Sequence, residues 1–422
     1  MNRFNLTLYS VLFSLALNCA FAQTILQTAS PASAKLSAER LQRIDQLIQQ
    51  NIDQKQISGA VGFVARDGKV IYNKALGYSD IEAKRALKTN DIFRIASQTK
   101  AITSVAVMML FEEGKFLLDD PISKYIPAFA KPTVLDKFNP ADSTYTTVPA
   151  KREITIRDLL THTSGIDYAV IGSANMKAIY ATSDIPPGFG SAAILKTEIE
   201  KLARFPLAHQ PGERFTYGLN TDVLGYLVEV VSRTSLDKFF TERIFKPLGM
   251  NDTHFYLPAS KYSRLIPIYT FNGQNNLVKY ERNGVITADY PKSNGTYFSG
   301  GAGLSSTIQD YAVFLQMLLN GGSYNGSRLL SRRSVDLMTM NQIGNLNVRE
   351  DKFGLGFQIT SKEGMSKFGV TEGSFAWGGY FGTTYWVDPV EKIVGVIFIQ
   401  QSPLRTDIHN KFKALVYQSL ND

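Results

Sequence analysis

The stretch "FRIASQTKAITSVAVMML", residues 93–110, decides how the rest of the chain folds. Its first residues are typical of a short strand. From Gln98 onward, apolar residues recur densely enough to predict a buried helix that ends at Gly114. Ser97 falls at the start of that helix, and Lys100 lies three residues later on the same helical face. A lysine in so apolar a setting needs a reason, because burial costs a charged side chain free energy.

The pair of Ser97 and Lys100 admits a catalytic and a structural interpretation. In the catalytic one, burial favours the neutral amine of Lys100 as a base, and the helix N-terminus favours negative charge developing beside Ser97. In the structural one, Ser97 caps the helix and Lys100 extends to solvent. A second Ser-x-x-Lys, from Ser235 to Lys238, is explained by a capped helix alone. The motif by itself leaves both interpretations open.

Strand and helix signals occur near both ends of the chain. An amphipathic helix with Ser37 as its N-cap comes first, and two apolar runs around Asp67-Gly68 then predict a hairpin. Near the other end, Thr307 is the expected cap of a further helix, and a last helix begins at about His409. Between these two helices lie three strand-like runs, "FGLGFQI", "GTTYWVDP" and "KIVGVIFIQ".

This arrangement predicts an α+β fold with two parts. Residues 23–130 and 290–422 are expected to form an antiparallel sheet, built from N- and C-terminal segments and flanked by helices. Residues 131–289 carry mostly helical patterns broken by loops rich in proline and glycine, and we expect them to form an inserted, mostly helical subdomain.

The N-terminus predicts an exported protein. Residues 1–22 combine Arg3, a short apolar stretch and small residues at Ala20 and Ala22, which is the pattern of a cleaved signal peptide. We therefore expect a periplasmic or secreted protein with no membrane span after cleavage. The only cysteine, Cys19, lies within this segment, so the mature chain is expected to have no disulfide.

Several classes of function are disfavoured by composition. The four histidines are scattered and no other cysteine accompanies them, so we expect no metal site and no cofactor. The net charge of +8 is spread along the chain without basic runs that interleave with aromatic residues, so nucleic acid is not an expected partner. A small-molecule substrate is expected instead, and the sequence carries no signal of oligomeric state.

Four motifs in order resemble those of the serine β-lactamase-like superfamily. Besides "FRIASQTKAI" they are "LLTHTSGI" (159–166), "GERFTYGLNTDVLGYLVE" (212–229) and "FAWGGYFGTTYWVDP" (375–389). The superfamily comprises class C β-lactamases, D-Ala-D-Ala peptidases and family VIII carboxylesterases, and the resemblance spans most of the mature chain. It implies a β-lactamase/transpeptidase-like fold.

The resemblance also implies a role for each matching residue. Ser97 would be the acylated nucleophile, Lys100 and Tyr217 would move its proton, and the backbone N–H groups of Ser97 and Tyr380 would form the oxyanion hole. Four further residues would contact substrate: Trp377, Gly378, Gly379 and Asn220. The usual Tyr-x-Asn is altered here, because Leu219 holds the third position and Asn220 comes one place late.

The third motif favours esters as substrates. Where β-lactamases have Lys-Thr-Gly, this chain has Trp377-Gly378-Gly379, as in the esterase-like branch. A lysine there supplies a cation for a substrate carboxylate, whereas an indole offers apolar surface and one N–H donor. We therefore expect a carboxylesterase for small to medium esters. A class C-like β-lactamase or D-Ala-D-Ala carboxypeptidase is the alternative, and a non-catalytic envelope binding protein with the same fold is the third.

Two other features of the sequence have a structural interpretation. His162 invites a Ser-His-Asp hypothesis, but no Gly-x-Ser-x-Gly elbow occurs in the chain, and the resemblance implies that the "HTSGI" motif shapes a loop beside the site. The loop at residues 182–193 is expected to border the pocket, together with the insert around 131–150.

Overall fold

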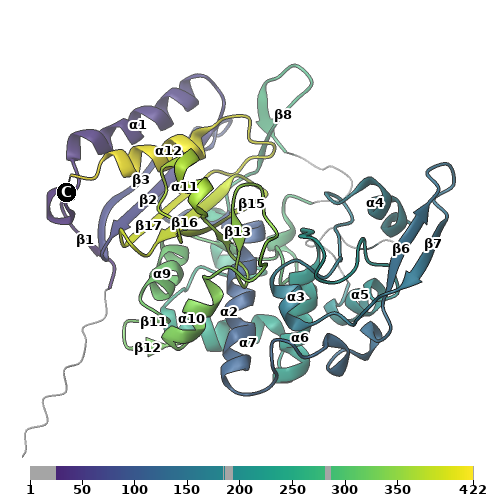
Figure 1. The fold of residues 1–422 in the computed structure, drawn as a ribbon. Coiled ribbons are helices and arrows are strands. Elements are labelled where there is room, and N and C mark those ends of the chain that lie inside the picture. Colours follow the sequence, from purple (N-terminus) through teal and green to yellow (C-terminus); the bar gives the residue numbers. More distant parts are fainter. Residues whose placement is uncertain (1–24, 184, 186–192, 281–286, 422) are drawn as a thin grey trace, which may run out of the picture.

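A mixed sheet of nine strands forms the centre of the fold (Figure 1). The structure, a computed structural model, describes residues 25–183, 185, 193–280 and 287–421, so the expected signal peptide at 1–22 lies outside the described residues. The main path of strands runs β1-β3-β2-β17-β16-β15-β14-β13, and β4 pairs with β3. The bounds are β1 (Gln27–Thr28), β2 (Gly59–Arg66), β3 (Lys69–Asp80), β4 (Arg85–Ala86), β13 (Lys352–Phe353), β14 (Gln358–Ile359), β15 (Phe375–Gly379), β16 (Thr383–Asp388) and β17 (Ile393–Phe398).

The two ends of the chain meet where β2 pairs with β17. This pairing confirms the expected sheet built from N- and C-terminal segments. The pairings along the main path are antiparallel except one, because the short strand β1 lies parallel to β3. The hairpin of β2 and β3 turns at Asp67-Gly68, as expected, and both residues have the positive φ that a tight hairpin turn requires.

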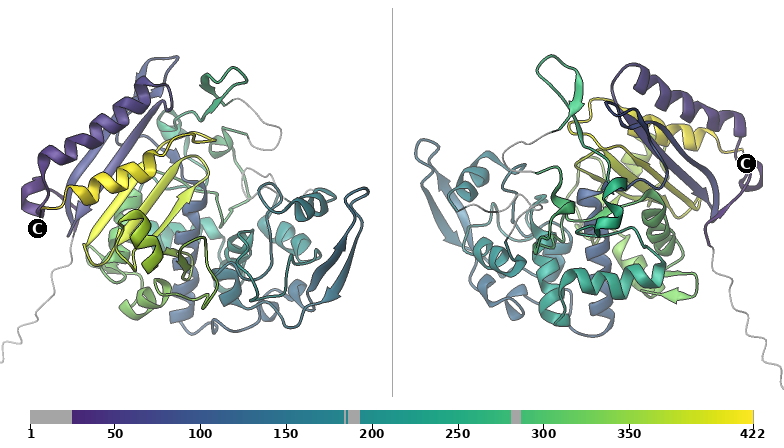
Figure 2. Two further views of the ribbon diagram at one scale, coloured as in Figure 1. Left: turned by 45° about the horizontal axis from the view of Figure 1, so that its top comes forward. Right: turned by 180° about the vertical axis from the view of Figure 1, so that it is seen from behind.

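Helices cover both faces of the sheet, because its central strands are apolar on both sides. In β2, Val61 and Phe63 belong to one hydrophobic cluster, and Ala60 and Val64 to the other. Helices α1 (Ala38–Asp53) and α12 (Ile408–Gln418) lie side by side on the second face (Figures 1 and 2). On the first face lies α9 (Ile308–Leu319), with α2 (Thr99–Glu112) beyond it.

The expected helix starts are mostly confirmed. Ser37 accepts a hydrogen bond from the backbone N–H of Arg40, and Thr307 accepts one from the backbone N–H of Asp310. Ser235 stands at the N-cap position of α7, but its side chain makes no capping bond, and Glu229 accepts from the N–H of Leu236 instead.

The segment between the two sheet-forming parts is helical, with two hairpins that the sequence did not predict. One hairpin, β6 (Thr133–Phe138) and β7 (Tyr145–Pro149), projects at the far end of the molecule from α1 (Figures 1 and 2), and the other is β8 (Tyr269–Phe271) and β9 (Leu277–Lys279). The domain limits at 130 and 290 stay a prediction. The helices are α3 (Ile156–Leu160), α4 (Ala174–Ala181), α5 (Leu195–Leu202), α6 (Asn220–Ser232), α7 (Leu236–Phe240) and α8 (Lys246–Leu248), the last preceded by a π-helical turn at Thr241–Phe245.

The remaining elements connect the middle segment to the sheet. The short strand β5 (Phe93–Arg94) pairs with β10 (Ser305–Ser306), which fixes the chain just before Ser97. The others are the hairpin of β11 (Ser323–Tyr324) and β12 (Ser327–Arg328), and the helices α10 (Arg332–Met338) and α11 (Lys362–Phe368). Among the described residues, no helix is both long and apolar enough to span a bilayer.

Candidate active site

Ser97 lies in a single 3-10 turn, Ala96–Gln98, directly before α2. The turn brings Ala96 into the left-handed region at φ 43° and leaves the Ser97 side chain half-buried. Gln98, not Ser97, holds the N-cap position of α2, and no side chain caps that end. The capping interpretation of Ser97 is therefore wrong.

Lys100 is buried beside Ser97. Its side chain is only 2% exposed, so the interpretation in which it extends to solvent is also wrong. The Lys100 Nζ atom lies 3.3 Å from Ser97 Oγ, 2.8 Å from the Tyr168 hydroxyl and 2.8 Å from the carbonyl oxygen of Gly301. Three acceptors thus match the three N–H donors of an ammonium group. In the neutral state, the lone pair of the amine can face the Ser97 hydroxyl.

Tyr217, from the loop before α6, and Trp377, from β15, lie at the same place. Lys100 Nζ lies 4.7 Å from the centre of the Tyr217 ring, and the indole Nε1 of Trp377 donates to the Tyr217 hydroxyl at 3.2 Å. Tyr217 lies in the loop three residues before α6 begins at Asn220, and Trp377 lies within β15. The structure therefore brings together residues 97, 100, 217 and 377, as the order of motifs predicted.

Tyr168 is a site residue that sequence reasoning missed. It lies two residues after the "HTSGI" motif and accepts the hydrogen bond from Lys100. Its ring lies 5.3 Å from that of Tyr217. Burial, followed by the nearby Tyr217, raises the pKa of Tyr168 well above its usual value, so this phenol stays protonated. The sequence signal that could have identified Tyr168 is its position in a loop that was already expected to shape the site.

His162 and Asn220 belong to the scaffold behind this site. Both are buried, and the Asn220 amide donates to Nδ1 of His162 at 2.9 Å and accepts from the Ser164 hydroxyl. Burial, and then the charge of Lys100, holds the pKa of His162 well below its usual value, so the imidazole is neutral. Asn220 is not among the residues that line the cavity of Ser97, because α6 begins at this residue and its side chain is enclosed. Its contact with substrate stays a prediction.

One cavity of about 530 Å³ joins the candidate residues. This size suits a small organic ligand. Its lining is mostly apolar or neutral, and Tyr380, the expected second oxyanion donor, is part of it. The lining residues are Ser97, Ile171, Phe215, Tyr217, Val348, Arg349, Gln358, Trp377, Gly378, Gly379 and Tyr380. Most of the loop at 182–193, which was expected to border the pocket, lies outside the described residues.

Gly379 allows β15 to approach the turn that carries Ser97. A Cβ atom at Gly379 would lie 2.3 Å from the carbonyl oxygen of Ile95, whereas one at Gly378 would have its nearest neighbour, the carbonyl oxygen of Thr383, at 3.3 Å. Both glycines keep a regular pairing with β16, opposite Thr384 and Thr383. The close approach therefore places Tyr380, the next residue, in the same cavity as Ser97.

Asp222 fixes the segment that holds Lys100. Its Oδ1 atom accepts from the Ser299 hydroxyl at 2.6 Å and from the backbone N–H of Gly301 at 3.4 Å, and the Gly301 carbonyl in turn accepts from Lys100. Burial raises the pKa of Asp222 to about 6, and the hydrogen bond from Ser299 and the charge of Lys100 oppose that rise. Asp222 lies within the motif at residues 212–229, but the sequence analysis assigned no role to this carboxyl group.

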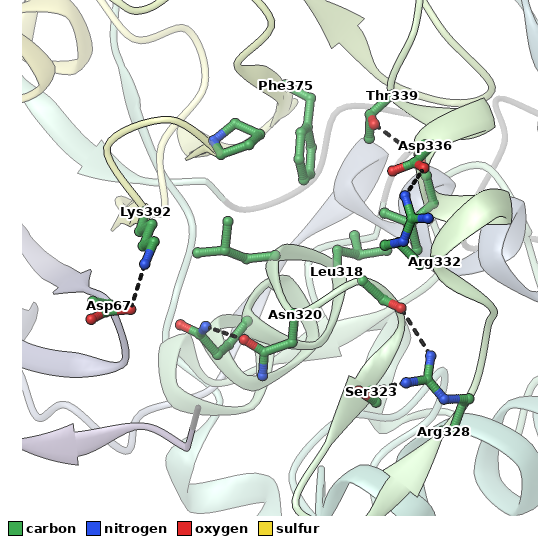
Figure 3. A pocket seen from close by; sticks show the side chains of 15 residues that line it. Asp67, Leu318, Asn320, Ser323, Arg328, Arg332, Asp336, Thr339, Phe375 and Lys392 are labelled. Atoms are coloured by element: carbon green, nitrogen blue, oxygen red, sulfur yellow. Dashed lines mark hydrogen bonds and ion pairs between the residues drawn. The ribbon is translucent and has the colours of Figure 1, made fainter. Parts of the chain in front are cut away.

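A second cavity, of about 560 Å³, has no comparable chemistry (Figure 3). Its lining includes two ion pairs, Lys392 with Asp67 and Arg332 with Asp336. The Ser323 hydroxyl in this lining accepts a hydrogen bond from Arg328. Within the described ranges, no group of three histidine, cysteine or acidic side chains is placed to hold a metal ion. We therefore assign the chemistry to the cavity of Ser97.

Comparison with known proteins agrees with this geometry. Residues 44–418 match the family described as "Beta-lactamase", and the chain belongs to the β-lactamase family. Protein Rv1367c of Mycobacterium tuberculosis H37Rv is 35% identical over 370 residues, which cover 84% of this chain and 89% of that protein. Esterase EstB of Burkholderia gladioli is 29% identical over 375 residues, which cover 85% and 90%.

A solved structure extends the similarity to the fold. It is described as "EstCE1, a hydrolase with promiscuous acyltransferase activity", and it matches with a TM-score of 0.77 at 26% identity. The match covers 91% of this chain and 99% of that one. The protein thus has a β-lactamase/transpeptidase-like fold and is a hydrolase of this family.

Gly379→Ala is expected to destabilise the protein more than Gly378→Ala. The added methyl group would meet the backbone oxygen of Ile95, and overpacking of this kind costs about 1–3 kcal/mol. Urea unfolding of the two variants measures the difference. Equal free energies of unfolding for both variants would contradict the close approach.

The pKa of Asp222 predicts a pH-dependent difference in stability from Asp222→Asn. A carboxyl group with a raised folded-state pKa stabilises the fold below the unfolded pKa, and this contribution is lost as the pH rises through about 6. Between pH 4.5 and 7.5 the native protein should lose roughly 2 kcal/mol of unfolding free energy relative to the variant. Urea unfolding at both pH values tests this, and a difference independent of pH would refute it.

Proposed function

We propose that the protein is an exported carboxylesterase for small to medium esters that works through an acyl-enzyme on Ser97. The observation that carries the proposal is the buried contact of 3.3 Å between Lys100 Nζ and Ser97 Oγ, in a cavity where Trp377 stands beside Tyr217. Export rests on the signal pattern of residues 1–22.

The first half-reaction forms the acyl-enzyme. Ser97 Oγ attacks the ester carbonyl carbon, and its proton passes to the pair of Lys100 and Tyr217, with Lys100 in direct contact. The negative charge on the carbonyl oxygen is stabilised by the backbone N–H groups of Ser97 and Tyr380. The intermediate then collapses, and the bond to the alcohol oxygen breaks as that oxygen takes the proton.

The second half-reaction repeats the sequence with water. Water loses a proton to the same pair and attacks the acyl carbon, and Ser97 leaves and recovers its proton. Tyr168, a protonated phenol, and the carbonyl oxygen of Gly301 hold Lys100 throughout. In this proposal the ester and water are the reactants that come from outside the chain.

The third motif favours esters over β-lactams and peptide termini, because Trp377 supplies no cation at that position. Ile171, Phe215 and Trp377 give the cavity an apolar surface. By the resemblance of the third motif, Trp377 corresponds to the lysine of β-lactamases. By their names, EstB is an esterase and EstCE1 a hydrolase. A class C-like β-lactamase or D-Ala-D-Ala carboxypeptidase remains the alternative, and substitution of Trp377 distinguishes it.

A non-catalytic envelope binding protein is the third alternative. A lysine that is 2% exposed and directed at a serine has no use in such a protein, because its burial costs free energy. The contact between Lys100 and Ser97 therefore supports an enzyme rather than a binding protein.

Ser97→Ala is expected to abolish ester hydrolysis. Turnover of 4-nitrophenyl acetate should fall at least about 1000-fold, because no other group replaces the nucleophile. Ser235→Ala is the matched control, since it removes the serine of the other Ser-x-x-Lys on α7. Full activity in the Ser97 variant, or equal losses in both variants, would refute the assignment.

Trp377→Lys is expected to raise β-lactam turnover relative to ester turnover. The new ammonium group would lie near the Tyr217 hydroxyl that now accepts from the indole, and would attract a substrate carboxylate. Trp377→Phe is the control, because it removes the indole N–H without adding charge. We expect the ratio of the two kcat/KM values to rise about tenfold in the lysine variant only. An unchanged ratio would show that this position does not select the substrate class.

A further inference from the structure

Arg349 is the one charged side chain among the described residues that line the cavity of Ser97. The rest of the lining consists of apolar, aromatic, glycine, serine and amide residues. Arg349 belongs to none of the four motifs, and the segment that carries it directly precedes β13. A cation therefore reaches this cavity from a part of the chain that the sequence did not connect with it.

A braced turn holds Arg349 at the cavity. The backbone of Val348 and Asp351 exchanges two hydrogen bonds, of 2.8 and 3.1 Å, so Arg349 and Glu350 form the tip of a tight turn. Arg349 has a φ of 57°, in the left-handed region that is uncommon for residues with a side chain and occurs in tight turns.

The base of this turn is anchored by the buried Asp351 side chain. It accepts from the Gln358 amide at 2.6 Å and from the backbone N–H of Ser361 at 3.0 Å. Gln358 itself lines the cavity, so the anchor and the cavity wall share a residue. These contacts fix the backbone of the turn that carries Arg349, and the Arg349 side chain itself is exposed.

The acidic neighbour of Arg349 is engaged elsewhere. Glu350 forms an ion pair with Lys367 of α11 and accepts a hydrogen bond from it. This hydrogen bond is the largest cause of the lowered pKa of Glu350. Lys367 is therefore the main partner of the Glu350 carboxylate, and the charge of Arg349 makes a smaller contribution. A guanidinium group at the cavity, with its fork of N–H donors, is well suited to a carboxylate.

We propose that the preferred substrates are esters that carry a carboxylate, and that Arg349 binds this group. The inference rests on the proposed esterase function and deepens it. The indole of Trp377 removes the cation expected at the third motif, and Arg349 supplies one at another point of the wall. Ile171, Phe215 and Trp377 would contact the apolar body of such an ester.

Two matched pairs of esters test the proposal and locate the carboxylate. The first pair carries the group on the alcohol side: the acetate esters of 4-hydroxybenzoate and 4-hydroxybenzamide. The second carries it on the acyl side: the 4-nitrophenyl monoester of terephthalate and the corresponding ester of terephthalamic acid. Within each pair the carboxamide replaces the carboxylate at similar size and without charge. The para position prevents intramolecular attack.

The variants are Arg349→Gln, Arg349→Lys and, as a control for net charge, Arg333→Gln on α10, where the side chain is 82% exposed. In at least one pair, Arg349→Gln should lower kcat/KM for the carboxylate ester about tenfold more than for the carboxamide. Arg349→Lys should recover part of that difference, and added salt should diminish the preference of the native protein. Arg333→Gln should leave the ratio unchanged.

Three results would overturn the inference. If Arg349→Gln affects both members of each pair equally, or if Arg333→Gln has the same effect, Arg349 does not bind the carboxylate. If the native protein hydrolyses the carboxamide esters through Ser97 but shows no preference that depends on Arg349, the inference fails while the esterase function stands. If the native protein hydrolyses none of the four esters, both proposals fail.

Discussion

The contact between Lys100 and Ser97 is the constraint on which the rest of the site depends. A lysine enclosed to this degree is stable only if its donors are satisfied and its charge is balanced or absent. Tyr168, the Gly301 carbonyl and Ser97 satisfy the donors, and the Tyr217 ring lies over the same nitrogen. Contacts with residues far away in the sequence therefore hold the Lys100 side chain in place.

The surrounding elements meet at this lysine. Helix α2 carries Lys100, the segment before β10 supplies Gly301, and Asp222 of α6 holds that segment in place. On the other side, β15 approaches the turn of Ser97 because Gly379 has no side chain. The sheet and the helices therefore converge on Ser97, and neither part of the chain forms the candidate site alone.

Sequence reasoning succeeded where the signals are local. The cap at Ser37, the turn at Asp67-Gly68 and the cap at Thr307 depend on neighbouring residues, and each is where it was expected. The order of the motifs also predicted correctly that residues 97, 100, 217 and 377 lie close together. Caps, turns and the order of motifs can each be predicted from the pattern of residues along the sequence.

Residues whose roles depend on distant partners were missed or misplaced. Tyr168 and Asp222 act on Lys100 across more than sixty positions of the chain, and no spacing rule connects them. Asn220 stands close to Tyr217 in sequence, but the start of α6 encloses its side chain beside His162. Arg349 likewise reaches the cavity only through a turn that Asp351 anchors.

The most direct test of the central claim is to locate the covalent intermediate. The protein would be incubated with a fluorophosphonate and separately with an activated ester, its intact mass measured, and the modified peptide sequenced. The account predicts a single adduct on Ser97 with both reagents, and a strongly reduced rate of labelling in Lys100→Met, which removes the amine at similar length. An adduct at another residue, or equal labelling of Ser97 without the Lys100 amine, would contradict it.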